Sequence, residues 1–272
     1  MANPIPALRL NTGAEMPALG LGVFRAPPEA AAAAVAAALQ AGYRHIDTAQ
    51  VYGHEAAVGA AVRESGLPRS EVFVTTKIAP TNMAGGLVEA SLRASVAALG
   101  FVPDLVLLHW PVPDHRAQAW ARLEALYLAG DLPAIGVSNF LERHLAGLLA
   151  GARVVPAVNQ VELSPFLQQA GTRAACVAAG VAVAAYSPLT KRRRLDHPVL
   201  ARIAARHSAT AAQVLIRWGL QKGVAVLPKS VRPERIAENF AAASLLLDAD
   251  DMAALDALEE NLVTGWNPQT VE

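Results

Sequence analysis

The sequence predicts one α/β domain spanning residues 1–272, folded as a (β/α)8 TIM barrel with a short N-terminal β-hairpin. Three observations lead to this fold class. The chain has 272 residues, and an eight-stranded α/β barrel typically needs about 250. Short apolar runs alternate with helical stretches along the whole chain, without a linker between them. Polar or ionisable residues stand where these runs end, as they do around the mouth of a barrel.

Eight runs rich in Val, Leu, Ile and Ala are the predicted strands, and segments with helical composition separate most of them. Apolar strands separated by helices predict βαβ units and a parallel sheet buried on both faces. Pro27 and Pro28 begin the first helix and Gly42 ends it, as the preferences of these residues favour. The predicted strands are 19–22, 44–47, 72–77, 104–109, 134–138, 157–160, 181–186 and 224–227. The predicted helices are 27–42, 55–64, 87–99, 116–129, 141–149 and 211–220.

The main competing fold is the doubly wound dinucleotide-binding sheet. That fold carries a G-x-G-x-x-G motif after its first strand. In this chain Gly20-Leu21-Gly22 continues into Val23-Phe24-Arg25, so the third glycine is missing. The absence of this motif favours the barrel.

Charge and cysteine content restrict the classes of partner. Lys plus Arg equals Asp plus Glu at 23 each, so the formal net charge is zero. A neutral chain has no general attraction for nucleic acid or anionic lipid, and we expect neither partner. The single cysteine, Cys176, excludes an intramolecular disulfide and is expected to be a small core residue. Residues 1–10 lack the pattern of a signal peptide, so a cytoplasmic protein without membrane or obligate protein partners is expected.

The residues that end the predicted strands have side chains suited to catalysis. In a parallel barrel the carboxyl ends of all strands meet at one mouth, which carries the active site. One polar residue at such a position can be a helix cap, but a succession of them indicates a site. These strand-end residues are Asp47, Lys77, His109, Ser138, Asn139, Gln160, Tyr186, Ser187, Lys229 and Ser230.

Six motifs, in order along the chain, resemble those of the aldo-keto reductase family. The resemblance extends from about residue 16 to about residue 239. Within the family, the motif sequences are most similar to those of the bacterial 2,5-diketo-D-gluconate reductase group. The motifs are Gly42-Tyr43-Arg44-His45-Ile46-Asp47-Thr48-Ala49 with Tyr52-Gly53, Leu108-His109-Trp110-Pro111, Ile135-Gly136-Val137-Ser138-Asn139-Phe140, Asn159-Gln160-Val161-Glu162, Ala185-Tyr186-Ser187-Pro188-Leu189, and Pro228-Lys229-Ser230 with Arg235, Ile236 and Asn239.

Four of these residues match a scheme for reducing a carbonyl group. Hydride addition leaves an alkoxide, so a proton must reach the oxygen, and Tyr52 is the predicted general acid. A free tyrosine titrates near 10, so a neighbouring Lys77 is expected to stabilise the phenolate and lower the pKa of Tyr52. Asp47 is expected to hold Lys77 in place. The resemblance implies that His109 orients the carbonyl group, and the scheme needs no metal.

The resemblance also implies NADPH as the cofactor. Ser138, Asn139 and Gln160 are expected near the nicotinamide, and Tyr186 is expected to stack on it. Barrels commonly bind phosphate in the loops after strands seven and eight. The further residues expected to bind the cofactor are Ser187, Leu189, Lys229, Ser230, Val231, Arg235 and Asn239. Residues 191–194 form a basic run with three interpretations, a solvated loop, a cover over the pyrophosphate, or a nucleic-acid patch, which the zero net charge and the few aromatic residues disfavour.

The sequence predicts less about the substrate than about the cofactor. Ala79 and Trp110 are predicted to line the substrate pocket. The family commonly places a tryptophan where this chain has Ala79, which implies a wider pocket. Trp266, near the end of the chain, either covers the substrate or packs on the barrel. The expected substrates are small carbonyl compounds, aldehydes and ketones, with diketo sugar acids among them.

Other interpretations stay open at this point. Asp47 can cap a turn and His109 can be a core histidine, whereas His45 is expected to be structural. The remaining histidines at 54, 115, 144, 197 and 207 stand in polar contexts and are expected to be solvated. A Schiff-base barrel enzyme using Lys77 or Lys229 is one alternative function. A non-catalytic relative that binds NADPH as a sensor or scaffold is the other.

Overall fold

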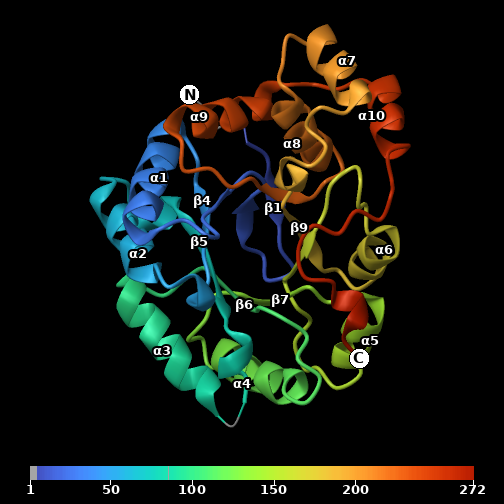
Figure 1. The fold of residues 1–272 in the computed structure, drawn as a ribbon. Helices are drawn as coiled ribbons and strands as arrows, with labels where there is room; N and C mark the ends of the chain where they lie inside the picture. The colour runs from blue at the N-terminus through green and yellow to red at the C-terminus, as the bar shows by residue number, and fades with distance from the viewer. Residues whose placement is uncertain (1–4, 85) are drawn as a thin grey trace.

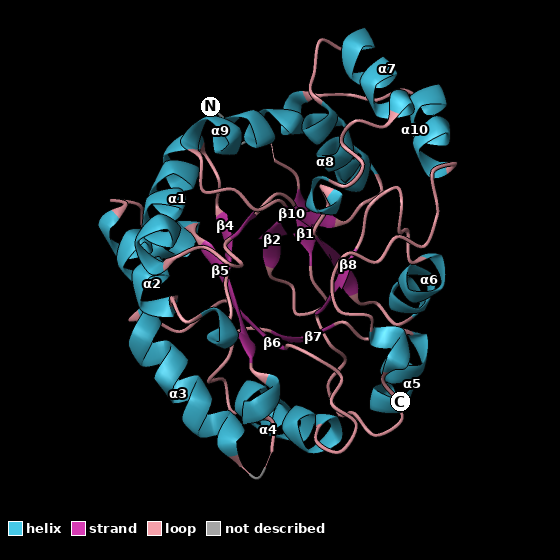
Figure 2. Ribbon diagram, viewed as in Figure 1, coloured by secondary structure: helices cyan, strands magenta, loops and turns pink. Residues whose placement is uncertain are grey.

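Eight parallel strands form a ring at the centre of the computed structural model, which describes residues 5–84 and 86–272 (Figure 1). In this sheet the strands follow the order β10-β9-β8-β7-β6-β5-β4-β3, so each one pairs with its neighbour in sequence. Figure 2 shows the helices as an outer layer around the strands. The ring strands are β3 (Leu21–Gly22), β4 (His45–Asp47), β5 (Phe73–Ile78), β6 (Leu105–Leu108), β7 (Ile135–Ser138), β8 (Val158–Glu162), β9 (Ala182–Tyr186) and β10 (Ala225–Leu227). The predicted (β/α)8 barrel is confirmed.

Backbone contacts between the first and last strands close the ring. Leu19 forms a parallel bridge with Val226, and Gly22 forms one with Lys229. The Gly22 amide donates to the Pro228 carbonyl at 3.0 Å. These contacts pair the two edge strands of the eight-stranded sheet with each other.

Helices cover the outside of the ring, and several are shorter than a typical helix. The sequence predicted α1 to α5 and α8 to within a few residues, but it did not delimit α6, α7, α9 or α10. Neither α6 nor α7 begins at a Ser, Thr, Asp or Asn, since their N-caps are Gln169 and His197. The helices are α1 (Pro28–Ala41), α2 (Glu55–Glu64), α3 (Leu87–Leu99), α4 (Arg116–Leu128), α5 (Glu142–Leu149), α6 (Ala170–Ala178), α7 (Pro198–Arg206), α8 (Ala211–Gln221), α9 (Pro233–Ala241) and α10 (Ala249–Asp256).

The predicted N-terminal hairpin closes the end of the barrel where the strands begin. Strand β1 (Ala7–Arg9) pairs antiparallel with β2 (Glu15–Pro17). Leu10 and Met16 are buried in one cluster with side chains from the amino ends of the barrel strands, including Phe73 and Leu105. Because one end of the barrel is filled in this way, the opposite, carboxyl end of the strands is the open mouth.

Small side chains allow the helices and strands to lie close together. Helix α1 buries Ala31, Ala34 and Ala38 against the barrel. In β7 a Cβ on Gly136 would come within 2.5 Å of the Val158 carbonyl oxygen, so only glycine fits there. Cys176 is buried in α6, as the sequence predicted. No helix in the described part of the chain is long and apolar enough to cross a membrane.

Candidate active site

The barrel geometry gathers the predicted site residues at the mouth. Asp47 is the last residue of β4, Lys77 lies in β5, and His109 directly follows β6. Ser138 and Tyr186 are the last residues of β7 and β9. Each lies at the carboxyl end of its strand, so segments far apart in sequence contribute to one site.

A buried ion pair lies at the base of this site. The Lys77 side chain is completely buried, and its Nζ donates to Asp47 Oδ1 at 2.6 Å. The same ammonium donates to the Thr48 carbonyl at 2.9 Å. Gln160 Nε2 donates to the second carboxylate oxygen, Asp47 Oδ2, at 2.6 Å. Each Asp47 oxygen therefore has its own donor, which is the condition under which a buried charge pair is tolerated.

Tyr52 lies over this ion pair. It ends the short 3₁₀ helix η1 (Gln50–Tyr52), and Gly53 follows in the left-handed conformation with φ of 73°. The centroid of the Tyr52 ring is 5.2 Å from Lys77 Nζ. It is 5.7 Å from the ring centroid of His109, which packs edge-on. The structure thus brings Asp47, Tyr52, Lys77 and His109 into one cluster.

The pKa of Tyr52 corrects one expectation from the sequence. Burial, and then the negative charge of Asp47, raise the pKa of Tyr52 well above its ordinary value. We expected Lys77 to lower it, but the Lys77 charge is paired with Asp47, and a phenolate would lose its hydration. Tyr52 is therefore a neutral phenol.

His109 is also held in its neutral form. Burial, with a smaller effect of the Lys77 charge, lowers the pKa of His109 to about 3. Its Nδ1 atom is buried and has no hydrogen-bond partner among the described residues. Asn139 Nδ2 donates to the His109 carbonyl at 3.0 Å and fixes the backbone beside Tyr52. A neutral imidazole in this position can donate one hydrogen bond without changing the charge of the site.

The residues expected near the nicotinamide form a connected polar group. Ser138 Oγ donates to the Gln160 carbonyl at 2.8 Å, and Tyr186 OH donates to Asn139 Oδ1 at 2.7 Å. Asn139 and Ser187 both adopt left-handed backbone conformations, with φ of 65° and 50°. Amides and hydroxyls of this kind fit the amide-bearing edge of a nicotinamide.

The residues expected at the nucleotide end lie on the loop after β10 and on α9. Val231 is exposed and Asn239 is buried, while Ser230 Oγ accepts from the Arg232 amide at 3.1 Å. Within the described residues, neither Lys229 nor Arg235 forms a hydrogen bond or an ion pair through its side chain. Helix α9 also begins without a side-chain cap. Two cations without protein partners, next to an uncapped helix N-terminus, fit a phosphate group.

The basic run 191–194 is not simply solvated. Lys191 Nζ donates to the Thr264 carbonyl at 2.6 Å, and Arg194 forms a two-bond ion pair with Glu260, at 2.6 and 3.1 Å. Residues 190–192 have positive φ values of 51°, 48° and 70°. These contacts connect the loop after β9 to the segment that follows α10.

Two of the histidines expected to be solvated are buried instead. His54 packs against Tyr52, and its Nε2 lies 3.1 Å from the Val23 carbonyl. His144 Nδ1 accepts from the Leu141 amide at the start of α5. His45 is buried between Pro17 and Thr75, as a structural histidine would be. The polar residues next to His54 and His144 in sequence did not reveal these contacts, because the contacts depend on the tertiary fold.

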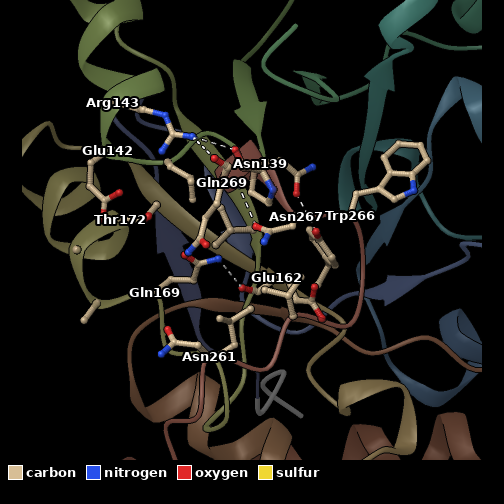
Figure 3. Close-up of a pocket in the computed structure, with 18 of the residues that line it drawn as sticks. Asn139, Glu142, Arg143, Glu162, Gln169, Thr172, Asn261, Trp266, Asn267 and Gln269 are labelled. Carbon is tan, nitrogen blue, oxygen red and sulfur yellow. Dashed lines mark hydrogen bonds between the residues drawn. The ribbon is translucent and has the colours of Figure 1, made fainter. Parts of the chain in front are cut away.

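Two further residues at the mouth were not identified from the sequence as functional. Gln50 Oε1 accepts from the Ala79 amide at 2.8 Å and so fixes the segment that carries the predicted pocket residue Ala79. Glu162, the last residue of β8, lines a cavity of about 500 Å³ together with several residues between 259 and 269 (Figure 3). The signal in the sequence was its place in the motif Asn159-Gln160-Val161-Glu162, although the predicted strand ended at residue 160 and no role was assigned to Glu162.

The fold and the site define a (β/α)8 barrel protein with Tyr52 over a buried Lys77–Asp47 pair at the carboxyl end of its strands. The family model described as "Aldo/keto reductase family" matches residues 18–260. The chain belongs to this family. Among the described residues, no group of three or more His, Cys, Asp or Glu side chains is arranged to hold a metal ion.

Individual relatives resemble the chain over nearly its whole length. Morphine 6-dehydrogenase of Pseudomonas putida is 42% identical, covering 100% of this chain and 97% of the relative. Glyoxal reductase of Bacillus subtilis is 41% identical, and the match covers 96% of this chain and 95% of the relative. The crystal structure of an aldo-keto reductase from a deep-sea metagenome of the Medee basin superposes with a TM-score of 0.94. It has 38% identity and covers 98% of this chain and 100% of the other.

Proposed function

We propose that this chain reduces aldehydes and ketones to alcohols with NADPH, and that Tyr52 is the general acid. The buried Lys77–Asp47 pair at 2.6 Å beneath the Tyr52 ring is the observation that carries this proposal. A completely buried lysine is rare unless it is paired, and a buried ionisable pair at the mouth of a barrel is a candidate functional site. Its charge lies where negative charge develops when Tyr52 gives up its proton.

The proposed mechanism assigns one task to each side chain. NADPH, when bound, supplies the hydride that adds to the carbonyl carbon and is itself oxidised to NADP⁺. Tyr52 transfers its proton to the carbonyl oxygen, so that the C=O group becomes a CH–OH group. Lys77 stabilises the resulting phenolate, and Asp47 holds Lys77 in position. Neutral His109 donates a hydrogen bond to the carbonyl oxygen and orients it.

NADPH is proposed over NADH because of the two cations near α9. The 2′-phosphate of NADPH adds close to two negative charges that the site must neutralise. Lys229 and Arg235 have no side-chain partner among the described residues and are available for this group. A planar guanidinium such as that of Arg235 can pair with two phosphate oxygens at once.

The names of two relatives indicate how widely the substrate can vary within the family. One relative is named for a large polycyclic alcohol and another for glyoxal, a very small dicarbonyl compound. In this chain Ala79 and Trp110 are proposed to line the pocket, and a methyl group at position 79 leaves room for bulky substrates. The proposed substrates therefore extend from small aldehydes and diketo sugar acids to aromatic carbonyl compounds.

An NADPH oxidation assay with a panel of aldehydes and ketones tests the proposal. We expect turnover that depends on the carbonyl compound and survives prolonged treatment with a strong chelator. NADPH binding without turnover of any compound would instead support the non-catalytic relative. A Schiff-base enzyme using Lys77 is disfavoured, because Lys77 is completely buried and donates to Asp47 and Thr48.

A further inference from the structure

Glu162 lies buried at the end of β8 and binds the backbone near the chain's C-terminus. It is 5% exposed. Its Oε1 accepts from the Thr264 amide at 2.9 Å and from the Thr264 hydroxyl. Its Oε2 accepts from the Gly265 amide at 2.9 Å. A buried carboxylate with three donors from two adjacent residues is a strong anchor, because bonds to a charged group are the stronger ones.

Residues 263–272 are here called the C-terminal segment. A second set of contacts holds this segment beyond Gly265, at residues 268–271. Arg143 Nη2 donates to the carbonyls of Pro268, Gln269 and Val271, at 3.2, 2.8 and 2.6 Å. His144 Nε2 lies 2.9 Å from the Val271 carbonyl. The segment is therefore fixed on both sides of residues 266–267.

Trp266 lies between these two sets of contacts, and the barrel does not bury it. It is 71% exposed, and its indole is directed away from Glu162 and Asn267 (Figure 3). Its ring meets that of Trp110 edge-on, with centroids 5.6 Å apart and an interplanar angle of 89°. Trp110 directly follows His109, so this contact places a large aromatic side chain at the edge of the mouth.

We propose that Glu162 determines substrate selectivity by holding Trp266 against Trp110, where the two indoles narrow one side of the mouth. This inference rests on the proposed carbonyl reduction for its readout. Glu162 is a positioning residue in this account, since it acts through the C-terminal segment. Releasing the segment lets Trp266 move away and admits bulky carbonyl compounds more readily.

The opposing possibility is that Glu162 serves only to stabilise the fold. The chain offers a matched control for this, because Glu124 in α4 is a similar anchor. Glu124 is 4% exposed and accepts from the amides of Arg153 and Val154 at 2.6 and 2.8 Å. Its third donor is Trp120 Nε1 at 3.0 Å. It holds residues that precede β8, whereas Glu162 lies at the opposite end of that strand.

The selectivity experiment compares Glu162→Gln with Glu124→Gln. Glutamine keeps the size of the side chain but replaces one acceptor oxygen by a donor, so at least one bond to the C-terminal segment is lost. The readout is the ratio of kcat/KM for 2-naphthaldehyde to that for benzaldehyde. We expect Glu162→Gln to raise this ratio about tenfold, which corresponds to the lower end of the free energy that one charged hydrogen bond contributes. We expect Glu124→Gln to change the ratio by less than about twofold.

A double variant shows whether the effect passes through Trp266. Trp266→Ala alone is expected to raise the same ratio, and adding Glu162→Gln is expected to raise it little further. Independent, multiplying effects would overturn the proposal, because they would mean that Glu162 acts elsewhere. An unchanged ratio in Glu162→Gln would overturn it as well. If that variant does not fold, Thr264→Val, which removes only the hydroxyl donor, is expected to shift the ratio a few-fold in the same direction.

Amide hydrogen exchange separates this inference from the proposed function. The Thr264 and Gly265 amides should exchange faster in Glu162→Gln, where both carboxylate oxygens accept hydrogen bonds. In Glu124→Gln the amide oxygen can keep all three bonds, because Oε1 alone accepts them, so the Arg153 and Val154 amides should change little. A wild-type protein without carbonyl reductase activity would refute the proposed function. The hydrogen-exchange measurement would still show whether Glu162 holds the C-terminal segment. Unchanged exchange at residues 264–265 in an active enzyme would overturn the inference alone.

Discussion

The two charged regions of the mouth differ in whether their charged side chains have partners within the protein. At the catalytic centre Lys77 and Asp47 are buried, paired at 2.6 Å and supported by Gln160. At the nucleotide end Lys229 and Arg235 have no side-chain partner among the described residues. The charges of the first region are paired within the protein, and under the proposed function the phosphate of NADPH completes the second. Electrostatic preorganisation of this kind is what catalysis gains most from.

This difference separates the expected effects of substitution. Changing a member of the buried cluster alters reactivity or leaves an uncompensated charge in the interior. Changing an unpaired cation at the nucleotide end is expected to leave folding intact and to weaken a ligand instead. Each experiment below compares one region with a control elsewhere in the chain.

The largest expected effect is that of Tyr52→Phe on turnover. Removing the hydroxyl removes the proton donor, and general acid catalysis contributes roughly 10²- to 10⁴-fold. We expect kcat to fall by that factor while the Kd for NADPH stays unchanged. Tyr43→Phe is the control, since its buried hydroxyl donates to the Ile236 carbonyl away from the site. A fall in kcat of less than fivefold would remove Tyr52 from the role of general acid.

Lys77→Met is expected to have the largest effect on stability. It leaves the Asp47 carboxylate buried with Gln160 as its remaining side-chain donor, and breaking a buried pair in this way costs about 3–5 kcal/mol. Lys222→Met is the control, because Lys222 binds Asp256 at the same 2.6 Å distance but is partly exposed. Exposed pairs contribute about 0–1 kcal/mol. Equal losses in urea unfolding would show that burial of the Lys77 pair is unimportant.

Much of this organisation was predictable from the sequence because it follows local patterns. Apolar strands between helices predicted a closed parallel sheet, and such a sheet brings Asp47, Lys77 and His109 to one edge whatever their separation in sequence. The open competitor fold was excluded correctly from a missing glycine after Gly22. The prediction succeeded where chain topology alone determines the outcome.

The features that the sequence did not reveal depend on partners distant in the chain. Glu162 binds Thr264, which lies 102 residues away in the sequence. No sequence pattern near either residue predicts that contact. The burial of His54 and His144 has the same origin, since Val23 and Val271 are their distant partners. The direction of the Tyr52 pKa shift depended on how completely the fold removes water from the phenol.

Arg235→Ala tests the nucleotide end. We expect the Kd for NADPH to rise by at least tenfold, since a charged hydrogen bond contributes about 1.5–3 kcal/mol, and the Kd for NADH to change by less than about threefold. Arg232→Ala is the control, because Arg232 is already paired with Glu234 at 2.6 Å. Fluorescence titration with both cofactors gives the four values. A matching loss for both cofactors would place Arg235 on a shared part of the dinucleotide and remove the main support for NADPH.

The last expected effect is a pH dependence of stability that comes from His109. Its pKa is lowered from 6.5 to about 3 in the folded protein, so below pH 6.5 the unfolded chain binds a proton that the folded protein does not. Stability rises with pH wherever the unfolded state binds more protons. The contribution of a neutral His109 is therefore fully present above pH 6.5 and is lost progressively as the pH falls toward 3.

His109→Asn isolates this contribution, because asparagine does not titrate while the buried His45 and His54 remain in both proteins. We expect the free energy of unfolding of the wild type to fall more steeply than that of the variant between pH 7 and pH 4.5. Urea unfolding at several pH values in this range measures both slopes. Parallel profiles would mean that His109 is solvated and titrates normally, and the catalytic centre would then be less preorganised than its geometry indicates.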